Sequence, residues 1–299
     1  MTPESQPKLK TVLITGGTDG LGRGAALYLA ARGYRVFAGG RNAERRAALD
    51  RLAREKQLPI ETMALDVCDD VSARAAVEQI SRTAGSVDVL INNAGIAIGA
   101  ALEEISLADL HKQFETNFFG AMRMAQLVLP EMRRRRLGRI INMSSIAGKI
   151  AIPLMGPYAA SKHALEAVSD SMRLETYPFG IHVVLIEPGY IHSSMSQNAA
   201  ELSSAYVNAA GGSAYRKIYE GFQKTWEKTV QASKYQPEDC ARVILRAIED
   251  RPPKARYLVT RDAKIAARLR HWLSDRAFDR ITRKRIGIEP LRETPAHDE

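Results

Sequence analysis

A tyrosine and a lysine four residues apart are the side chains in this sequence with the clearest chemical use. Tyr158 and Lys162 lie early in a segment of helical composition that runs to Tyr177, so both side chains project from one face of a helix. A phenol has a pKa of about 10, and a neighbouring ammonium group favours the phenolate and lowers that pKa. The pair therefore predicts a group that donates or accepts a proton near neutral pH.

Two further polar residues precede this pair. Ser145 follows a β-rich run from Arg139 to Met143, and site residues gather at the carboxyl ends of parallel strands, so we expect its hydroxyl to hold a substrate carbonyl. Asn117 interrupts a segment predicted as one helix, Leu107–Val128, where asparagine is a poor helix former. We expect its amide to anchor a water relay to Lys162. Taken singly, each of these residues also has a purely structural interpretation.

A glycine-rich turn near the start of the chain supplies a second functional feature. A β-rich run leads through Thr15-Gly16-Gly17-Thr18-Asp19-Gly20-Leu21-Gly22 into a helical segment. Bare glycine backbone lets a dinucleotide pyrophosphate approach, and the helix N-terminus favours its charge. A structural turn is the alternative for glycines alone, but the order strand, turn, helix is the one that this site requires. We therefore predict that Thr15, Gly16, Thr18, Asp19, Gly20, Leu21 and Gly22 bind a nicotinamide dinucleotide.

The end of the second predicted strand, Tyr34–Ala38, bears on the choice of cofactor. A carboxylate at this place binds the ribose diol of NAD(H) and repels a 2′-phosphate. The sequence has Gly39-Gly40-Arg41 there, and a guanidinium suits a bidentate contact with phosphate. We therefore expect NADP(H) to be favoured over NAD(H), with a merely solvated Arg41 as the alternative. Asp19 opposes this preference, because a basic residue at that position would strengthen it.

The elements that must position these residues alternate between strands and helices, which predicts βαβ units and a parallel sheet with helices on both faces. We expect one Rossmann-type, doubly wound α/β domain over residues 1–260, with a substrate lid at 190–235 and a C-terminal helical extension at 261–299. The predicted elements are Thr11–Thr15, Tyr34–Ala38, Ile60–Leu65, Val87–Ile91, Arg139–Met143, Ile181–Ile186 and Arg256–Val259 as strands, and Leu21–Ala31, Ala43–Lys56, Val71–Arg82, Leu107–Val128, Tyr158–Tyr177 and Pro237–Ile248 as helices.

Together these motifs resemble the short-chain dehydrogenases/reductases of the single-domain type that carries an NNAG motif. The resemblance covers about Lys10 to Tyr257, with Thr15–Gly22 as the glycine motif, Asn92-Asn93-Ala94-Gly95 as NNAG, and Asn117, Ser145, Tyr158 and Lys162 as the catalytic set. It implies that Asp66 holds the adenine, that Pro188, Gly189 and Ile191 line the nicotinamide, and that Ser193, where the family commonly has threonine, contacts the carboxamide. Val67, Asn93, Ala94, Gly95, Tyr158 and Lys162 complete the implied cofactor contacts.

The segment from Tyr158 to Ser194 is similar, more narrowly, to the branch that contains 17β-hydroxysteroid and retinol dehydrogenases. This similarity implies hydride transfer to or from a lipophilic alcohol, ketone or aldehyde of steroid, retinoid or lipid type. Aromatic residues of the lid would either line such a pocket or simply pack their helices: Tyr206, Tyr215, Tyr219, Phe222 and Trp226. One alternative function is reduction of a β-ketoacyl thioester on a carrier protein, which the C-terminal extension disfavours. Another is non-catalytic nucleotide sensing, which the intact catalytic set disfavours.

The charge of the chain is concentrated near its C-terminus. Residues 261–287 contribute six of the nine net positive charges, and apolar residues recur among them at helical spacing. Such a basic amphipathic segment packs on the domain with a charged outer face, closes the pocket, or makes a peripheral contact with an anionic membrane. No element for reading nucleic acid accompanies the charge, so we expect no nucleic-acid partner.

Composition places further bounds on the protein. Cys68 and Cys240 form neither a disulfide framework nor a metal-binding pattern, so we expect a reducing compartment and no metal site. No signal peptide or membrane-spanning run is recognisable, which predicts a cytoplasmic protein, either free or peripheral to a membrane. The family resemblance implies a homodimer or homotetramer formed through the helices that carry Asn117 and Tyr158, unless the C-terminal extension blocks one of those faces.

Overall fold

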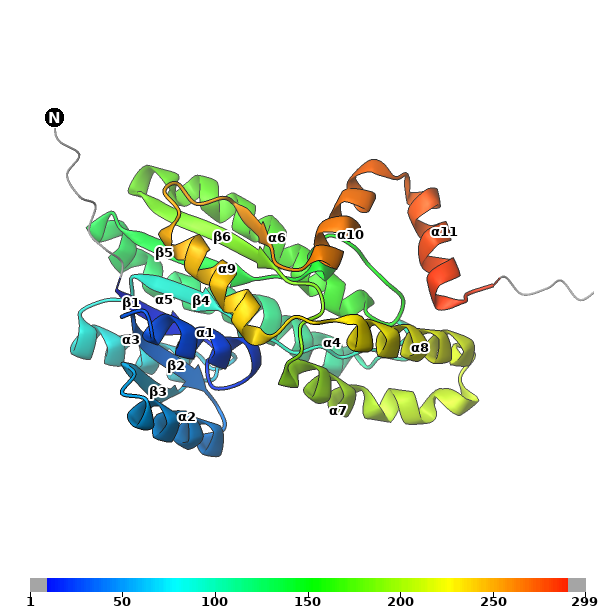
Figure 1. The fold of residues 1–299 in the computed structure, drawn as a ribbon, viewed down its shortest axis with the longest axis horizontal. Helices are drawn as coiled ribbons and strands as arrows, with labels where there is room; N and C mark the ends of the chain where they lie inside the picture. Colours follow the sequence, from blue (N-terminus) through cyan, green and yellow to red (C-terminus); the bar gives the residue numbers. More distant parts are fainter. Residues whose placement is uncertain (1–9, 290–299) are drawn as a thin grey trace, which may run out of the picture.

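A computed structural model describes residues 10–289 of the chain, and a single parallel sheet forms its centre (Figure 1). Within the described residues, seven strands pair in the order β3-β2-β1-β4-β5-β6-β7, every neighbouring pair parallel. The Rossmann-type α/β fold expected from the sequence is therefore confirmed. The strands are β1 Thr11–Ile14, β2 Arg35–Gly40, β3 Ile60–Ala64, β4 Val89–Asn92, β5 Gly138–Met143, β6 Ile181–Glu187 and β7 Arg256–Leu258.

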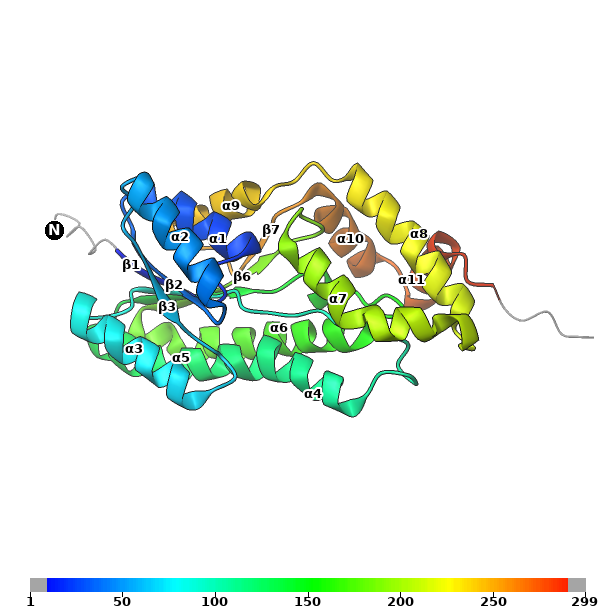
Figure 2. The same ribbon diagram turned by 90° about the horizontal axis from the view of Figure 1, so that it is seen from below.

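Helices cover both faces of this sheet, and each face has its own apolar core (Figure 2). One core joins the strands to α1 (Gly20–Ala30), α2 (Ala43–Glu55) and α9 (Pro237–Glu249). The other joins them to α3 (Asp70–Ala84), α5 (Gly120–Arg135) and α6 (Gly156–Thr176). Because both faces are covered, the central strands are continuous apolar runs, as in Val12, Leu13 and Ile14, rather than alternating ones.

The strand order reverses direction between β1 and β4, and this topology determines where a site can form. Ile14 of β1 pairs with Ile91 of β4 on one side and with Ala38 of β2 on the other. The loops that follow β1 and β4 therefore diverge to opposite faces and leave a crevice at the carboxyl edge of the sheet, which is the usual ligand position in an open α/β sheet.

The segment expected as one helix, Leu107–Val128, is helical throughout, but it is not a regular α-helix along its whole length. The chain forms α4 (Leu107–Phe114), a π-helical turn η1 (Glu115–Phe119) and then α5. The amide of Asn117, in the middle of the turn, binds both backbone polar groups of Ile96, accepting from its N–H at 2.8 Å and donating to its carbonyl at 2.9 Å. A side chain that binds backbone outside its own helix explains why this helix widens here, and π-turns of this kind frequently lie at functional sites.

The sheet ends in helices that gather at its carboxyl edge. Residues 190–235 form α7 (Ser194–Ala209), a short turn η4 (Ala210–Gly212) and α8 (Arg216–Ala232). The C-terminal extension forms α10 (Arg261–Trp272) and α11 (Asp275–Ile286). Figure 2 shows these four long helices together at one end of the molecule. Within residues 10–289, no helix combines the length and the apolar character that crossing a membrane requires.

A fully buried arginine near the amino end of β5 connects the sheet to the last turn of α9. Arg139 of β5 has no exposed surface, and its guanidinium donates to the carbonyl groups of Ala247 and Ile248 in the last turn of α9. Burial lowers the pKa of Arg139 to about 10, with the charge of Arg251 adding to the effect. A buried cation at the negative end of a helix satisfies carbonyls that have no partner within the helix.

Candidate active site

The turn after β1 has the backbone of a phosphate cradle. Gly16 and Gly20 have φ angles of +61° and +50°, which side-chain-bearing residues rarely adopt. A Cβ placed on Gly22 would lie 2.2 Å from the carbonyl oxygen of Gly16, so this position admits glycine alone. Asp19 accepts a hydrogen bond from the N–H of Gly20 at 2.8 Å and caps α1. The positive backbone angles and the helix N-terminus fit a dinucleotide pyrophosphate.

One pocket at the crevice collects most of the residues predicted to bind the cofactor. It is lined by the predicted residues Gly16, Thr18, Asp19, Gly20, Leu21, Arg41, Asp66, Val67, Asn93, Ala94, Gly95 and Ser193. It is also lined by residues that sequence reasoning did not select, among them Asn42, Arg45, Ile96, Thr116, Ser194, Met195 and Asn198. Three of these residues, Ser194, Met195 and Asn198, belong to α7, so the segment predicted as the lid contributes to the wall of this pocket.

Thr15 lies behind the pocket instead of lining it, and its side chain is already engaged. Its hydroxyl accepts the backbone N–H groups of Asn93 and Ala94 at 2.9 and 3.0 Å. In return, the amide of Asn93 donates to the carbonyls of Thr15 and Gly16 at 2.9 and 3.1 Å. These four bonds fasten the loop after β4 to the glycine turn, so the two walls of the crevice are held at a fixed separation.

Two arginines and two carboxylates surround the end of β2. Arg41 Nη1 lies 3.7 Å from Asp66 Oδ2, and Arg45 Nη1 lies 2.5 Å from Asp19 Oδ2. Asn42 caps α2 by accepting the N–H of Arg45 at 2.8 Å, which places Arg45 in the first turn of that helix. The sequence did contain a signal for Arg45, since it lies three residues after a helix N-cap and four after Arg41.

Tyr158 and Lys162 both lie in the first turns of α6 and are both buried. The ammonium nitrogen of Lys162 is 5.8 Å from the centre of the Tyr158 ring and donates to the carbonyl of Met143 at 2.9 Å. Burial lowers the pKa of Lys162 to about 8, against the charge of Glu166, which raises it. Burial also raises the pKa of Tyr158, opposed by a hydrogen bond with Ser145. The lowering of this pKa expected from the sequence depends on an oxidised nicotinamide ring as well as on Lys162.

Asn117 lies beside this pair, but its amide binds protein groups. Besides its two bonds to Ile96, Asn117 donates to the hydroxyl of Ser161 at 3.0 Å. A Cβ built on Gly95 would lie 3.2 Å from Asn117 Oδ1 and 3.7 Å from Lys162 Nζ, so the loop after β4 passes directly over both residues. The amide therefore fixes the strand loop, the π-turn and α6 with respect to one another.

The loop that carries Ser145 and the loop after β6 are joined to each other and to the C-terminal extension. Ile146 donates its N–H to the carbonyl of Pro188 at 2.8 Å. Gly189 donates its N–H at 3.1 Å to the hydroxyl of Thr260, which also caps α10. The residues that the family resemblance places at the nicotinamide are thus attached on one side to Ser145 and on the other to α10.

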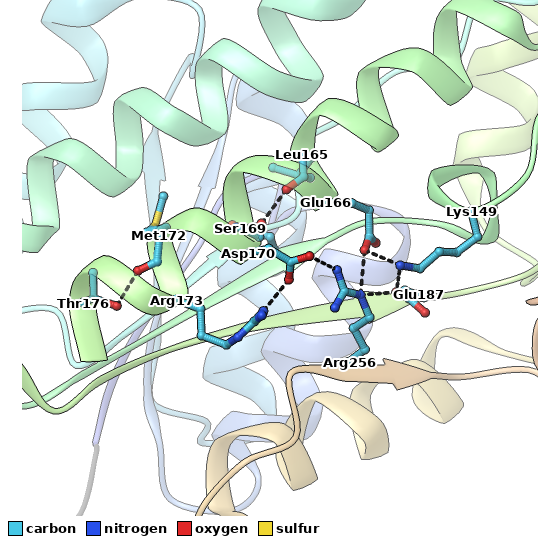
Figure 3. A network of polar contacts seen from close by, with 11 residues as sticks. Lys149, Leu165, Glu166, Ser169, Asp170, Met172, Arg173, Thr176, Glu187 and Arg256 are labelled. Carbon is cyan, nitrogen blue, oxygen red and sulfur yellow. Dashed lines mark hydrogen bonds and ion pairs between the residues drawn. The ribbon is translucent and has the colours of Figure 1, made fainter. Parts of the chain in front are cut away.

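A network of charges around two buried glutamates lies one helical turn beyond Lys162 (Figure 3). Glu166 of α6 accepts hydrogen bonds at 2.9 Å from both Lys149 and Arg256. The same two cations lie 3.5 and 3.3 Å from the carboxylate of Glu187, whose side chain is only 2% exposed. Arg256 also binds Asp170 at 2.6 Å. Nothing in the sequence singled out these residues, because they come from four separate segments.

The aromatic residues of the lid divide into two groups. Three tyrosine hydroxyls bind carboxylates in α4 or in the segment before it: Tyr206 binds Asp109 in the first turn of α4 at 2.5 Å, and Tyr215 and Tyr219 bind Glu103 and Glu104 before the helix at 2.5 and 2.8 Å. Phe222 instead stacks on Trp226 with ring centres 6.1 Å apart, and Trp226 meets Tyr190 edge-on at 5.1 Å. The tyrosines therefore fasten the lid, while the second group forms an apolar cluster.

Within residues 10–289, no group of three or more His, Cys, Asp or Glu side chains is arranged to hold a metal ion. The candidate site consequently consists of the cofactor pocket, the buried tyrosine and lysine, and the loops attached to them.

Comparisons with known proteins place this arrangement in a family. Residues 10–203 match the family model described as short chain dehydrogenase. The chain is 40% identical over 193 residues to the 3-ketodihydrosphingosine reductase of Bacteroides thetaiotaomicron, covering 64% of this chain and 67% of the relative. It is 36% identical over 267 residues to retinol dehydrogenase 8 of Bos taurus, covering 86% and 84% of the two chains.

A solved structure agrees with these relatives. A short-chain dehydrogenase from Streptomyces avermitilis is similar with a TM-score of 0.74 and 28% sequence identity, covering 93% of this chain and 99% of that one. The fold, the family model and the relatives agree with the resemblance carried by the motifs. The chain is an oxidoreductase that acts on CH–OH groups with a nicotinamide cofactor and belongs to the short-chain dehydrogenase/reductase family.

Proposed function

We propose that this oxidoreductase uses NADP(H) and a lipophilic alcohol, ketone or aldehyde of lipid, steroid or retinoid type. The observation that carries the proposal is the position of the buried pair Tyr158 and Lys162: Lys162 lies against Gly95, which lines a pocket that also presents two arginines at the end of β2. The substrate class is supported by the relatives, since one is named for a long-chain ketone and another for retinol.

The residues of the glycine turn would hold the pyrophosphate against backbone N–H groups. Asp66 would accept from the adenine amine, and Ser193 at the start of α7 would reach the carboxamide, with Pro188, Gly189 and Ile191 beneath the ring. Thr15 and Gly22 are proposed to act from behind the pocket, by keeping the turn in shape. When bound, NADP(H) supplies or accepts the hydride.

Tyr158 would move the proton that accompanies this step. In reduction its hydroxyl donates a proton to the carbonyl oxygen of the substrate, and in oxidation its phenolate accepts that proton from the alcohol. Lys162 stabilises the phenolate through its positive charge, which a pKa of about 8 leaves largely in place at neutral pH. Ser145 holds the substrate oxygen, and Asn117 acts as a positioning residue through its bonds to Ile96 and Ser161.

The preference for NADP(H) rests on Arg41 together with Arg45. Both line the pocket at the end of β2, where a 2′-phosphate would lie. Arg41 lies near Asp66, and Arg45 pairs with Asp19. A phosphate therefore competes with these two carboxylates for the guanidinium groups. A 2′-phosphate can accept bidentate hydrogen bonds from these guanidinium groups in place of the carboxylates, whereas NADH offers no anion at this place.

The experiment measures NADPH and NADH binding by fluorescence titration and then NADPH oxidation with a panel of carbonyl compounds. The panel pairs long-chain ketones and aldehydes with short polar ones and adds a β-ketoacyl thioester on its carrier protein. We expect Tyr158→Phe to bind NADPH normally and to lose activity by about 10²–10⁴-fold. Tyr177→Phe, an exposed tyrosine after the same helix, serves as the control.

Three outcomes would contradict the proposal. Equal turnover by Tyr158→Phe and the wild type would exclude the proton-transfer role. Tighter binding of NADH than of NADPH would exclude the cofactor preference. Preference for the carrier-bound thioester, or for the short polar compounds, would replace the proposed substrate class with another.

A further inference from the structure

The outer face of α10 carries an apolar stripe that the described part of the chain leaves partly exposed. Ile265, Leu269 and Trp272 recur at intervals of four and three residues, so they lie along one side of the helix. Their exposed fractions are 48%, 41% and 81%. A tryptophan left four-fifths exposed at the end of a helix is costly in water, and α11 adds a further exposed apolar side chain, Ile281.

Cations flank this stripe. Arg261 lies four residues before Ile265, and Arg268 lies three residues after it, so both guanidinium groups emerge beside the apolar side chains. The two helices and the turn between them hold nine lysines and arginines and three aspartates. Of these nine cations, Arg270 alone forms an ion pair within residues 10–289, with Asp275 at 2.7 Å.

The two helices are fastened to the body of the protein at both ends. The first turn of α10 is held through Thr260, whose hydroxyl binds the loop at Gly189. The last turn of α11 packs on α8, where Thr225 donates to the carbonyl of Arg285 at 3.1 Å and Ile286 is buried. Figure 1 shows the turn between α10 and α11 pointing away from the sheet. The stripe is therefore held in a fixed orientation.

We propose that the outer face of α10 and α11 docks on the surface of an anionic lipid bilayer, with Trp272 at the level of the headgroups. Leu269 and Ile265 would enter the acyl boundary beside it, and Arg261 and Arg268 would pair with anionic headgroups, as basic amphipathic helices do when they lie in a membrane interface. This proposal adds to the oxidoreductase function and stands independently of which substrate the site takes.

Charge complementarity favours a bilayer over a second copy of this chain. A symmetric dimer through α10 would bring the same surplus of cations against itself, and like charges oppose association. A single stripe of three apolar side chains also offers far less apolar surface than a stable protein interface buries. An anionic bilayer meets both features at once, since it offers negative charge above an apolar layer.

The chain supplies its own probe for the experiment, because it contains two tryptophans. Trp226 is packed between Tyr190 and Phe222, so Trp226→Phe leaves Trp272 as the only emitter. We expect vesicles of phosphatidylcholine with phosphatidylserine to shift the Trp272 emission to the blue by about 10 nm, as entry into the interface requires. Pure phosphatidylcholine vesicles should give a much smaller shift, and raising NaCl from about 0.05 M to about 0.5 M should reverse binding.

Matched variants locate the contact by vesicle co-sedimentation in the otherwise wild-type chain. Trp272→Ala and the double variant Arg261→Gln with Arg268→Gln should each weaken binding by about tenfold. Tyr177→Ala and Arg82→Gln, which remove an exposed aromatic and an exposed cation from other helices, should leave it unchanged.

The proposal is overturned if the anionic vesicles produce neither a blue shift nor co-sedimentation, or if both vesicle types bind equally at high salt. It is also overturned if the emission of Trp272 shifts with protein concentration in the absence of lipid, because this would identify the stripe as a contact between copies of the chain.

Discussion

Glu166 and Glu187 face each other across the same two cations, Lys149 and Arg256, although one glutamate lies on α6 and the other ends β6. Burial, together with the negative charge of Glu166, raises the pKa of Glu187 to about 7, against the opposing charges of Lys149 and Arg256. Glu187 directly precedes the Pro188–Gly189 loop, and Glu166 is four residues after Lys162. Through Lys149 and Arg256, the two glutamates therefore connect the Pro188–Gly189 loop to the part of α6 that carries Lys162.

A first prediction concerns stability as a function of pH. The folded protein holds the proton of Glu187 more tightly than the unfolded chain, so stability present below about pH 4.5 is lost as the pH rises through about 7. Glu187→Gln removes this dependence. The free energy of unfolding should therefore fall less between pH 5 and pH 8 in the variant than in the wild type, by on the order of 1 kcal/mol. Thermal unfolding of both proteins at the two pH values measures this, and an unchanged difference between them would contradict it.

A second prediction concerns catalysis and Glu166. Reduction needs the ammonium form of Lys162, so kcat/KM should fall as the pH rises above about 8. The charge of Glu166 raises the pKa of Lys162, so Glu166→Gln should lower that pKa and move the midpoint to lower pH by about half a unit. Asp170→Asn, which removes another carboxylate bound to Arg256, is the control and should not move the midpoint. A loss of stability in Glu166→Gln without a shifted midpoint would leave Glu166 a purely structural role.

The end of β2 yields a third prediction. Arg41→Ala and Arg45→Ala should each weaken NADPH binding by about tenfold and leave NADH binding nearly unchanged, because only NADPH has the 2′-phosphate. Asp19→Asn should strengthen NADPH binding, since it frees Arg45 from its ion pair. Titration with both cofactors measures these effects, and a loss of NADH binding equal to that of NADPH would show that the arginines support the fold instead.

A fourth prediction concerns the fastening of the lid. Tyr219 donates to Glu104 and accepts the N–H of Ala101 at 3.0 Å, so Tyr219→Phe leaves both groups without this partner. We expect amide exchange in α7 and α8 to increase and KM for the substrate to rise by about two- to tenfold, with NADPH binding little changed. Phe222→Leu is the control, because it reduces apolar packing in the same helix without removing a hydrogen bond. Comparing the two variants separates the effect of the lost hydrogen bonds from the effect of lost packing. Unchanged exchange would contradict the fastening role.

The fifth prediction concerns Arg139. Arg139→Met leaves the last carbonyls of α9 without their donor and should destabilise the protein by about 2–4 kcal/mol in urea unfolding. Arg139→Lys keeps the charge, but its single ammonium must reach the place of Nη1, the one nitrogen that donates to these carbonyls, and we expect it to recover only part of this loss. A fully stable Arg139→Met would indicate that desolvation of the guanidinium offsets all its hydrogen bonds.

The sheet was predictable because each strand is a short apolar run that can be recognised from neighbouring residues alone. Val12-Leu13-Ile14 and the glycine turn after them indicate a strand, a turn and a helix within a few residues. The right-handed crossover between parallel strands then permits few topologies. The π-turn at Asn117 was not predictable in this way. Asn117 binds the backbone of Ile96, which is 21 residues earlier in the sequence, and the two residues come together only when the chain folds.

The candidate site shows the same division. Tyr158 and Lys162 are adjacent on one helix, so spacing alone brings them together, and the glycine turn is continuous in sequence. The network of Lys149, Glu166, Glu187 and Arg256 spans four elements, and each residue by itself looks like an ordinary surface charge. Likewise, the sequence made the lid tyrosines candidates for lining an apolar pocket, whereas in the structure their hydroxyls bind carboxylates in α4 and in the segment before it.

The hydroxyl of Thr260 belongs to two structures at once, because it caps α10 and accepts the N–H of Gly189. A Cβ on Gly189 would lie 2.3 Å from that hydroxyl oxygen, so no larger residue fits between them. The C-terminal extension is consequently not a detachable module: a chimera joined at residue 260 must bring a threonine or serine to this place and keep the glycine opposite it. Exchange of tails among related chains would have to preserve this pair as well as the contact of α11 with α8.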